Sequence, residues 1–256
     1  MKVIVGKIVF TFLFGIYCHA TYAQEFDIVG LKLGMSVAQV HEALIAYGVD
    51  QKDIRENRQY YSYTDGVEQF QTDAFVTYIN AFRNRDGSTD ALGIFFSSSP
   101  LEGGVVAITR EMGNQTNPTT RRQYLEALRN KYGQPTSEDI STVQWDFPTG
   151  KTQCIVGGVG TYGPAQPSIL KKIYGANVGT RDGVLHNQKA KLLSDCASYL
   201  TYAMPSGDDS AVTRATAVMV DVAGTAEGEL SANEWVAGLA EQARKVREAR
   251  GKKPEL

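Results

Sequence analysis

The chain has 256 residues, of which 43% are hydrophobic and 21% are charged, and its formal net charge is −2. This composition is ordinary for a globular protein and excludes collagen-like and low-complexity chains. The slight excess of acidic residues disfavours binding to nucleic acid or anionic lipid, because both need a basic face.

The N-terminal segment, from Met1 to Ala23, has the pattern of a cleavable secretory signal peptide. Lys2 and Lys7 give a basic start, residues 8–17 form an apolar run, and small residues precede a cleavage site after Ala23 or Ala20. A membrane-spanning helix needs roughly 20 apolar residues, about twice this run, so we expect cleavage and no transmembrane anchor.

Cleavage after Ala23 would leave a mature chain that spans Gln24 to Leu256. Because it removes two lysines and no acidic residue, the net charge falls from −2 to −4. Cys18 suggests a lipoprotein as an alternative, but Tyr17 precedes it, where a lipid-modified cysteine needs a small residue. We therefore expect a periplasmic or secreted protein.

Cys154 and Cys196 are the cysteines of the mature chain. An even number in an exported protein predicts a disulfide. Closing this loop should stabilise the fold by roughly 4 kcal/mol in the chain-entropy model. Two buried thiols are the alternative, whereas His41 and His186 lack the spacing of zinc ligands.

The first predicted helix covers residues 37–47 and follows a short strand at 27–32. Ser36 and Gln39 form a capping box, and Gly48 supplies a left-handed stop.

A β region follows this helix. Its aromatic and β-branched residues predict strands at 58–64, 67–72, 74–83, 91–97 and 105–110. Asp65-Gly66 predicts a two-residue hairpin turn. Residues 84–90 sparsely resemble a calcium loop, but they lack its closing Glu and are interpreted as a turn.

A second helix is predicted between Thr120 and Gly133, with Thr120 and Gln123 as its capping box. It shares Ser/Thr-x-x-Gln-x-x-Glu-Ala-Leu and a Tyr-Gly exit with the first helix, so that Thr120 corresponds to Ser36. A strand motif also recurs, since residues 76–78 are similar to residues 200–202.

These similarities predict two copies of a helix-plus-sheet unit. The two strand segments lie further apart in the chain than the two helix segments do, which predicts an insertion in the second copy, within 136–198. Chance similarity between capped amphipathic helices is the alternative.

The remaining predicted elements are a hairpin of 142–147 and 151–156, a Gly-rich loop at 157–168, a strand at 212–222 and a helix at 232–249. Ser231 and Glu234 form a third capping box. Trp235, Leu239, Ala243 and Val246 share one face of this last helix, and the basic residues of its last turns are interpreted as a solvated helix end.

None of the motifs for cofactor binding fits its context. Gly158-Val-Gly160-Thr-Tyr-Gly163 matches G-x-G-x-x-G, but prolines follow where a dinucleotide site needs a helix. The P-loop glycine is replaced by Trp145, and no second histidine follows His41 by one turn. We therefore expect no cofactor, metal site or catalytic residue from these motifs.

Tyrosines on predicted strands are the one unusual enrichment. They are Tyr60, Tyr61, Tyr63, Tyr78, Tyr199 and Tyr202. Tyrosine is enriched at protein interfaces, so these residues are candidate binding residues. The alternative is that the rings mainly cover the core.

Residues 34–40 read Gly34-Met35-Ser36-Val-Ala-Gln39-Val40. This segment resembles the Gly-Met-Ser/Thr-x-x-Gln-Val opening of the SmpA/BamE-like outer-membrane assembly lipoproteins and of the β-lactamase-inhibitor-protein-like domains. The resemblance implies helices packed on one face of an antiparallel sheet, in tandem for the inhibitor type, and non-catalytic protein binding. The chain differs in lacking a suitable lipid-modification cysteine.

The sequence thus predicts an α+β protein with two tandem helix-on-antiparallel-sheet units, the second expanded, and a C-terminal amphipathic helix. The expected organisation is a signal peptide at 1–23, units at 24–112 and 113–224, and a helix at 225–256. The leading hypothesis is an exported protein-binding module. The alternatives are an envelope-polymer hydrolase with a carboxylate pair and a purely structural envelope protein.

Overall fold

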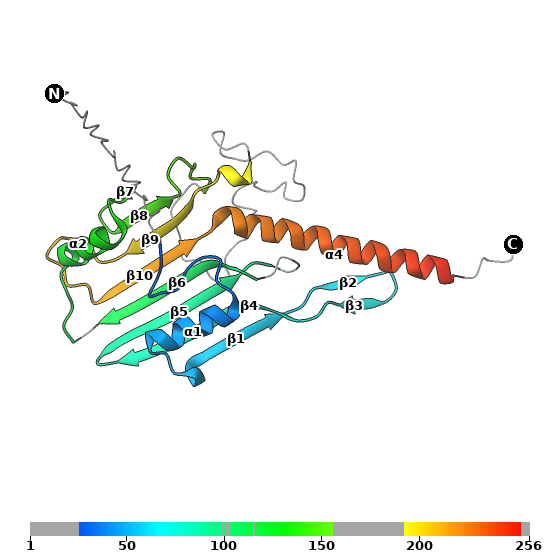
Figure 1. Ribbon diagram of the computed structural model, residues 1–256, viewed down its shortest axis with the longest axis horizontal. Coiled ribbons are helices and arrows are strands. Elements are labelled where there is room, and N and C mark those ends of the chain that lie inside the picture. Colours follow the sequence, from blue (N-terminus) through cyan, green and yellow to red (C-terminus); the bar gives the residue numbers. More distant parts are fainter. Residues whose placement is uncertain (1–25, 99, 101–102, 115, 156–191, 252–256) are drawn as a thin grey trace, which may run out of the picture.

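The computed structural model of the chain describes residues 26–98, 100, 103–114, 116–155 and 192–251 (Figure 1). Over these residues the protein is α+β, as the sequence predicts, with an eight-stranded antiparallel sheet and three α-helices. The helices are α1 (Val37–Tyr47), α2 (Arg121–Tyr132) and α4 (Val222–Arg250). Short 3₁₀ turns occur at Gln51–Asp53 and Leu193–Asp195.

The large sheet has the strand order β1-β4-β5-β6-β10-β9-β8-β7. Its strands are β1 (Ile54–Gln59), β4 (Phe75–Arg85), β5 (Ser88–Phe96), β6 (Val105–Asn114), β7 (Ser137–Glu138), β8 (Thr142–Phe147), β9 (Ser198–Ala203) and β10 (Arg214–Val220). A separate ribbon pairs β2 (Ser62–Thr64) with β3 (Gln69–Gln71).

The first two helices begin and end where the sequence predicts. The Ser36 hydroxyl accepts from the Gln39 amide N–H, and the Gln39 side chain accepts from the Ser36 N–H. Gly48 ends α1 in the left-handed region at φ 91°, where a side chain would be strained. The capping box of α2 pairs Thr120 with Gln123 in the same way.

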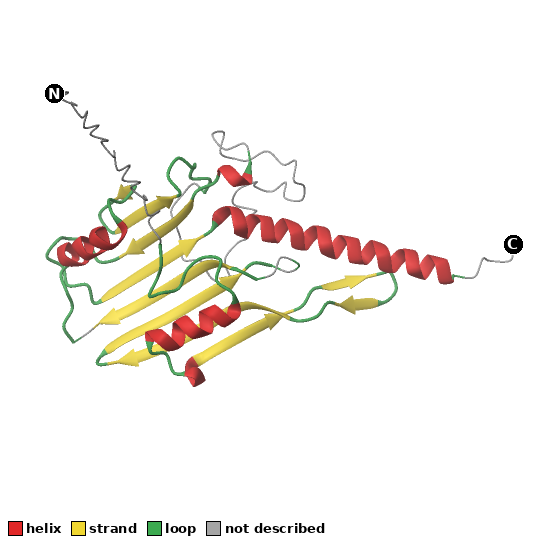
Figure 2. Ribbon diagram, viewed as in Figure 1, coloured by secondary structure: helices red, strands yellow, loops and turns green. Residues whose placement is uncertain are grey.

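Two hydrophobic cores lie on opposite faces of the sheet, whose strands are yellow in Figure 2. Neighbouring strand residues point to opposite faces, so Ile94 and Phe95 of β5 belong to different cores. Helices α1 and α2 cover the core that contains Ile94. The first turns of α4 cover the other, which contains Phe95, Val106, Ala107, Cys154, Cys196, Tyr199, Val218, Val220, Val222, Ala226 and Leu230.

Helix α4 begins at Val222, well before the predicted start at residue 232. Asp221 is its N-cap, since its Oδ1 accepts from the Gly224 N–H at 2.9 Å. The predicted capping box at Ser231 is therefore wrong, because Ser231 lies inside the helix. Glycines such as Gly228 lower helix propensity. A Cβ on Gly228, however, would lie 3.2 Å from the Ser98 backbone nitrogen, so glycine allows close packing there.

Several predicted β features differ from the structure. The strand predicted at 58–64 is divided between β1 and β2, and the turn predicted at 84–90 overlaps the ends of β4 and β5. Residues 27–32 form a tight turn with a single bridge between Ile28 and Leu31, because Val29 and Gly30 have positive φ angles that end an extended strand. Residues 151–155 form no strand, and β8 pairs instead with β7 and β9. The turn after β2 spans four residues rather than two, because Thr64 pairs with Gln69.

The Gly-rich loop predicted at 157–168 and the signal peptide predicted at 1–23 lie outside the described residues. The predicted disulfide is confirmed: Cys154 and Cys196 are bonded, with their Cα atoms 5.4 Å apart. Their bond ties the segment after β8 to the segment before β9 in the core under α4.

A helix followed by four strands of the large sheet occurs twice along the chain. Counted from the two sheet edges, β4 corresponds to β8 and β5 corresponds to β9. The similarity between residues 76–78 and 200–202 instead aligns β4 with β9, so it joins strands at different places in the sheet. A duplication remains a prediction, and of the two sequence similarities behind it only that between the helices joins corresponding elements.

None of the helices in the described part of the chain is both long enough and apolar enough to cross a membrane.

Candidate functional site

Beyond the sheet, the distal half of α4 lies beside the β2–β3 ribbon (Figure 1). We call this projection, residues 60–74 and 233–250, the arm. In the arm, the predicted apolar face of the last helix, with Trp235 and Leu239, is turned towards the ribbon. Tyr61 contacts Trp235 edge-on with ring centroids 6.2 Å apart, and it also packs on Phe75 at 5.2 Å. The arm is therefore fixed to the sheet by an aromatic cluster at its base.

A groove of about 610 Å³ runs between the ribbon and the helix of the arm. Its lining consists of Tyr63, Asp65, Val67, Glu68, Phe70, Leu239, Gln242, Ala243, Val246, Arg247 and Arg250. Tyr63 and Phe70 are stacked with their centroids 5.4 Å apart and form the ribbon wall. Apolar surface with charged residues around it is the usual composition of a binding groove.

The tip of the ribbon is held on the helix by charge. Asp65 Oδ1 accepts from the backbone N–H groups of Glu68 and Val67 at 2.7 and 2.8 Å, and these hydrogen bonds lower the pKa of Asp65. Arg247 Nη1 lies 3.7 Å from the same oxygen. A Cβ on Gly66 would come within 2.9 Å of Arg247 Nη1, so glycine leaves room for the guanidinium.

The arm also exposes large apolar side chains. Val67 is 78% exposed, Tyr60 51% and Val246 43%. Single exposed apolar residues are common on protein surfaces, but three of them on one projection make the arm a candidate interaction surface.

The structure separates the six predicted tyrosines. Tyr60, Tyr61 and Tyr63 lie together in the arm, although Tyr60 and Tyr61 are in the connection before β2 rather than in a strand. Tyr78 is partly buried on β4, where its ring lies 4.7 Å from that of Phe95 and burial raises its pKa.

Tyr199 and Tyr202 are core residues, with 5% and 4% of their surfaces exposed. Tyr199 belongs to the core under α4, and Tyr202 packs between α2 and the sheet. The alternative interpretation, that the rings mainly cover the core, fits these two residues, because alternate residues of β9 face two covered sides of the sheet.

Asp90 is the centre of a buried cluster of charges. The sequence pattern did not indicate this cluster, because it predicted a turn at Asp90. Asp90 lies in β5 with 1% exposure, and its oxygens accept from Arg83 Nη2 at 2.9 Å, Arg110 Nε at 2.6 Å and the Tyr47 hydroxyl at 2.6 Å. Arg83 also donates to the Tyr47 carbonyl and stacks over its ring at 3.9 Å. Burial and the Asp90 hydrogen bond raise the pKa of Tyr47 to about 12. The cluster therefore anchors the end of α1 to the sheet.

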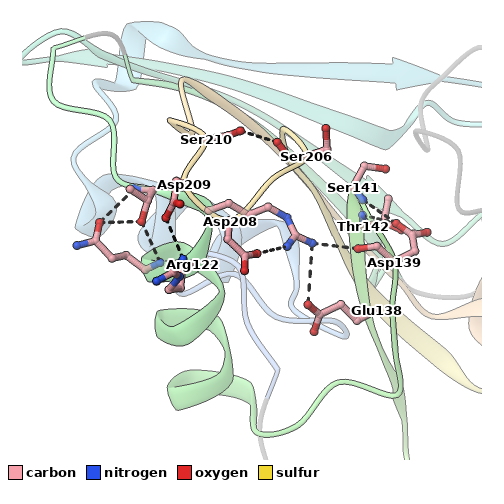
Figure 3. A network of polar contacts seen from close by, with 12 residues as sticks. Arg122, Glu138, Asp139, Ser141, Thr142, Ser206, Asp208, Asp209 and Ser210 are labelled. Atoms are coloured by element: carbon pink, nitrogen blue, oxygen red, sulfur yellow. Dashed lines mark hydrogen bonds and ion pairs between the residues drawn. The ribbon is translucent and has the colours of Figure 1, made fainter.

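A second polar cluster joins the start of α2 to two loops (Figure 3). Arg121, buried at 6% exposure, places Nη1 3.4 Å from Asp208 Oδ1 and Nη2 3.9 Å from Glu138 Oε1. Arg121 Nη2 also donates to the Asp139 carbonyl at 3.0 Å. The positive charge of Arg121 offsets the negative charges of Asp208 and Glu138. The cluster therefore holds elements of the fold together.

Carboxylate-pair hydrolysis requires a general acid with a raised pKa beside a second carboxylate. Asp139 does not qualify, because the Thr142 hydroxyl and neighbouring N–H groups lower its pKa. Burial raises the pKa of Asp146, whose Oδ1 accepts from Gln144 Nε2. The pocket beside it, of about 350 Å³, is lined by Phe26, Tyr132, Gln134, Thr136, Trp145, Asp146, Phe147, Pro148 and Thr149. Asp146 is the one carboxylate among these described residues, which leaves that pocket without a pair.

No protein-family model, curated protein or solved structure matches the chain. The resemblance of residues 34–40 to SmpA/BamE-like and inhibitor-type modules therefore stays a prediction. In the structure this segment docks on β6, since Gly34 N–H donates to the Val105 carbonyl and Val105 N–H donates to the Met35 carbonyl.

Proposed function

We propose that the protein is an exported, non-catalytic protein-binding module of the cell envelope or secreted space, and that the arm is its contact surface. The signal-type N-terminus supports export. The disulfide is compatible with an oxidising compartment.

The groove of the arm is the observation that carries this proposal. Its walls combine the stacked Tyr63 and Phe70 with the apolar face of α4, and Val67 and Val246 in this lining are exposed. Aromatic and aliphatic anchors with charged residues at the rim are the usual anatomy of a protein interface. A carboxylate pair for hydrolysis has weaker support, since the Asp65 carboxylate in this groove already accepts from two backbone N–H groups and faces Arg247.

Affinity capture with the mature chain, residues 24–256, tests the proposal. A partner from envelope extract or growth medium should be retained by the unchanged protein and lost with Val67→Asp, which places a charge at a site that is 78% exposed. Ile140→Asp is the matched control, because Ile140 is 76% exposed on the body of the protein. The double variant Tyr61→Ala/Tyr63→Ala should also lose the partner.

Equal recovery of the same partner by the Val67→Asp and Ile140→Asp variants would remove the arm from the proposal. Circular dichroism of each variant checks that the fold is unchanged. Hydrolysis of an envelope polymer by the unchanged protein would instead support an enzyme.

A further inference from the structure

We infer that the partner of the arm is a second copy of this chain, bound through the groove across a two-fold axis. This inference deepens the proposed function and rests on it. It follows from the distribution of charge on the two walls of the groove.

The two walls of the groove carry opposite charge. The ribbon wall contributes Asp65 and Glu68, and the last turns of α4 contribute Arg247 and Arg250. Two copies related by a two-fold axis that runs parallel to the groove place the acidic wall of each against the basic wall of the other. A uniformly acidic or basic ligand would meet one wall of its own sign.

Glu68 and Arg250 are the groups available for such a contact. Asp65 and Arg247 already face each other at 3.7 Å within one chain. Over the described residues, neither the Glu68 carboxylate nor the Arg250 guanidinium has an ion pair or side-chain hydrogen bond. Both line the groove near the tip of the arm, so a two-fold axis at the tip pairs Glu68 of each copy with Arg250 of the other.

The edges of the large sheet offer a less suitable route to self-association. The edge strand β1 carries Arg55, Glu56 and Arg58, and its register shifts between Asn57 and Arg58. The opposite edge strand, β7, is two residues long. Charges, bulges and short edge strands all oppose strand-to-strand pairing, whereas the arm projects beyond the sheet.

Exposed apolar residues supply the remaining contact. Val67 and Val246 flank the opposite charges on the same surface. In a two-fold pair each copy contributes these side chains once, so four exposed valines would be covered together. Apolar burial supplies affinity here, and the charge pairs fix the orientation.

Charge reversal tests the inference with the mature chain. Sedimentation or light scattering over a concentration series should show a dimer. Glu68→Arg alone and Arg250→Glu alone should each weaken the dimer by about tenfold or more, because each creates two like-charge contacts across the axis. A mixture of the two variants should regain the dimer, since both contacts between unlike chains are then attractive.

Lys52→Glu is the control for charge reversal, because Lys52 is 77% exposed and lies outside the arm. This variant should dimerise like the unchanged chain. A monomer at every concentration would overturn the inference, and so would single variants that stay weak when mixed. If such a monomer still captures another protein and loses it with Val67→Asp, the proposed function stands and only the identity of the partner is wrong.

Discussion

The body of the sheet and the arm differ in how they hold charge. In the body, Asp90 is almost fully buried, and two arginines and a tyrosine donate to it. In the arm, Glu68 and Arg250 have no side-chain partner within the described chain and border exposed apolar residues.

This difference separates structural groups from groups available for binding. A buried charge is tolerated only when nearby groups compensate it, so the contacts of Asp90 serve folding. A surface charge needs no such compensation and can add specificity to an interface. We therefore expect changes in the body to alter stability and changes in the arm to alter association.

The largest effect is expected from Asp90→Ala. Because the change leaves the Arg83 and Arg110 guanidinium groups without their buried carboxylate, the free energy of unfolding should fall by about 3–5 kcal/mol. Urea denaturation followed by circular dichroism measures this loss. Asp50→Ala is the control, since this side chain is 76% exposed and makes no capping hydrogen bond to the 3₁₀ turn that follows it, and it should cost less than about 0.5 kcal/mol. Equal losses would mean that the buried cluster does not anchor the body.

Removal of the disulfide should have the next largest effect. Cys154→Ser/Cys196→Ser should lower the free energy of unfolding by about 2–4 kcal/mol, since the unfolded chain gains freedom. The arm lies outside the segment that this bond ties down, so association should persist wherever the variant is folded. Loss of association by a fully folded variant would show that the two regions are coupled.

Alkaline pH should weaken the body through its buried tyrosines. Burial is the main cause that raises the pKa of Tyr124 to about 12, against an ordinary value of 10.0. The stabilisation that neutral Tyr124 gives to the folded state is fully present below about pH 10 and is lost as pH rises towards 12. At pH 11 the raised pKa of one such tyrosine should lower the free energy of unfolding by about 1 kcal/mol.

Urea unfolding at about pH 8 and pH 11 measures this loss. In Tyr124→Phe the difference between the two pH values should be about 1 kcal/mol smaller than in the unchanged protein. An unchanged difference would indicate that Tyr124 titrates normally in the folded state.

The smallest effect on stability is expected from Tyr63→Ala in the arm. Its ring stacks on Phe70 at a partly exposed groove, so unfolding should change by no more than about 1 kcal/mol. The dissociation constant for the partner should rise by about tenfold, as for an interface tyrosine. The opposite result, a large loss of stability with unchanged affinity, would reverse the comparison between arm and body.

Only three of the six candidate tyrosines, Tyr60, Tyr61 and Tyr63, lie in the arm. Period-two alternation puts strand residues on two faces, but it does not say that both faces are covered at β9, as they are around Tyr199 and Tyr202. The groove combines residues far apart in the chain, such as Tyr63 and Leu239, which no local pattern connects. The missed start of α4 has a similar cause, since Gly228 is favoured by packing on Ser98 rather than by helix propensity.

What the sequence determined by itself was local: the capped helices α1 and α2, most strands of the sheet, the α+β class and the pairing of Cys154 with Cys196. Capping bonds between residues three apart specify the helices, the aromatic and β-branched runs specify the strands, and a single pair of cysteines leaves one possible disulfide. Tertiary structure alone decided which charges are buried, which tyrosines are exposed and how the ribbon meets α4. These depend on burial, which is a property of the packed chain and not of any one segment.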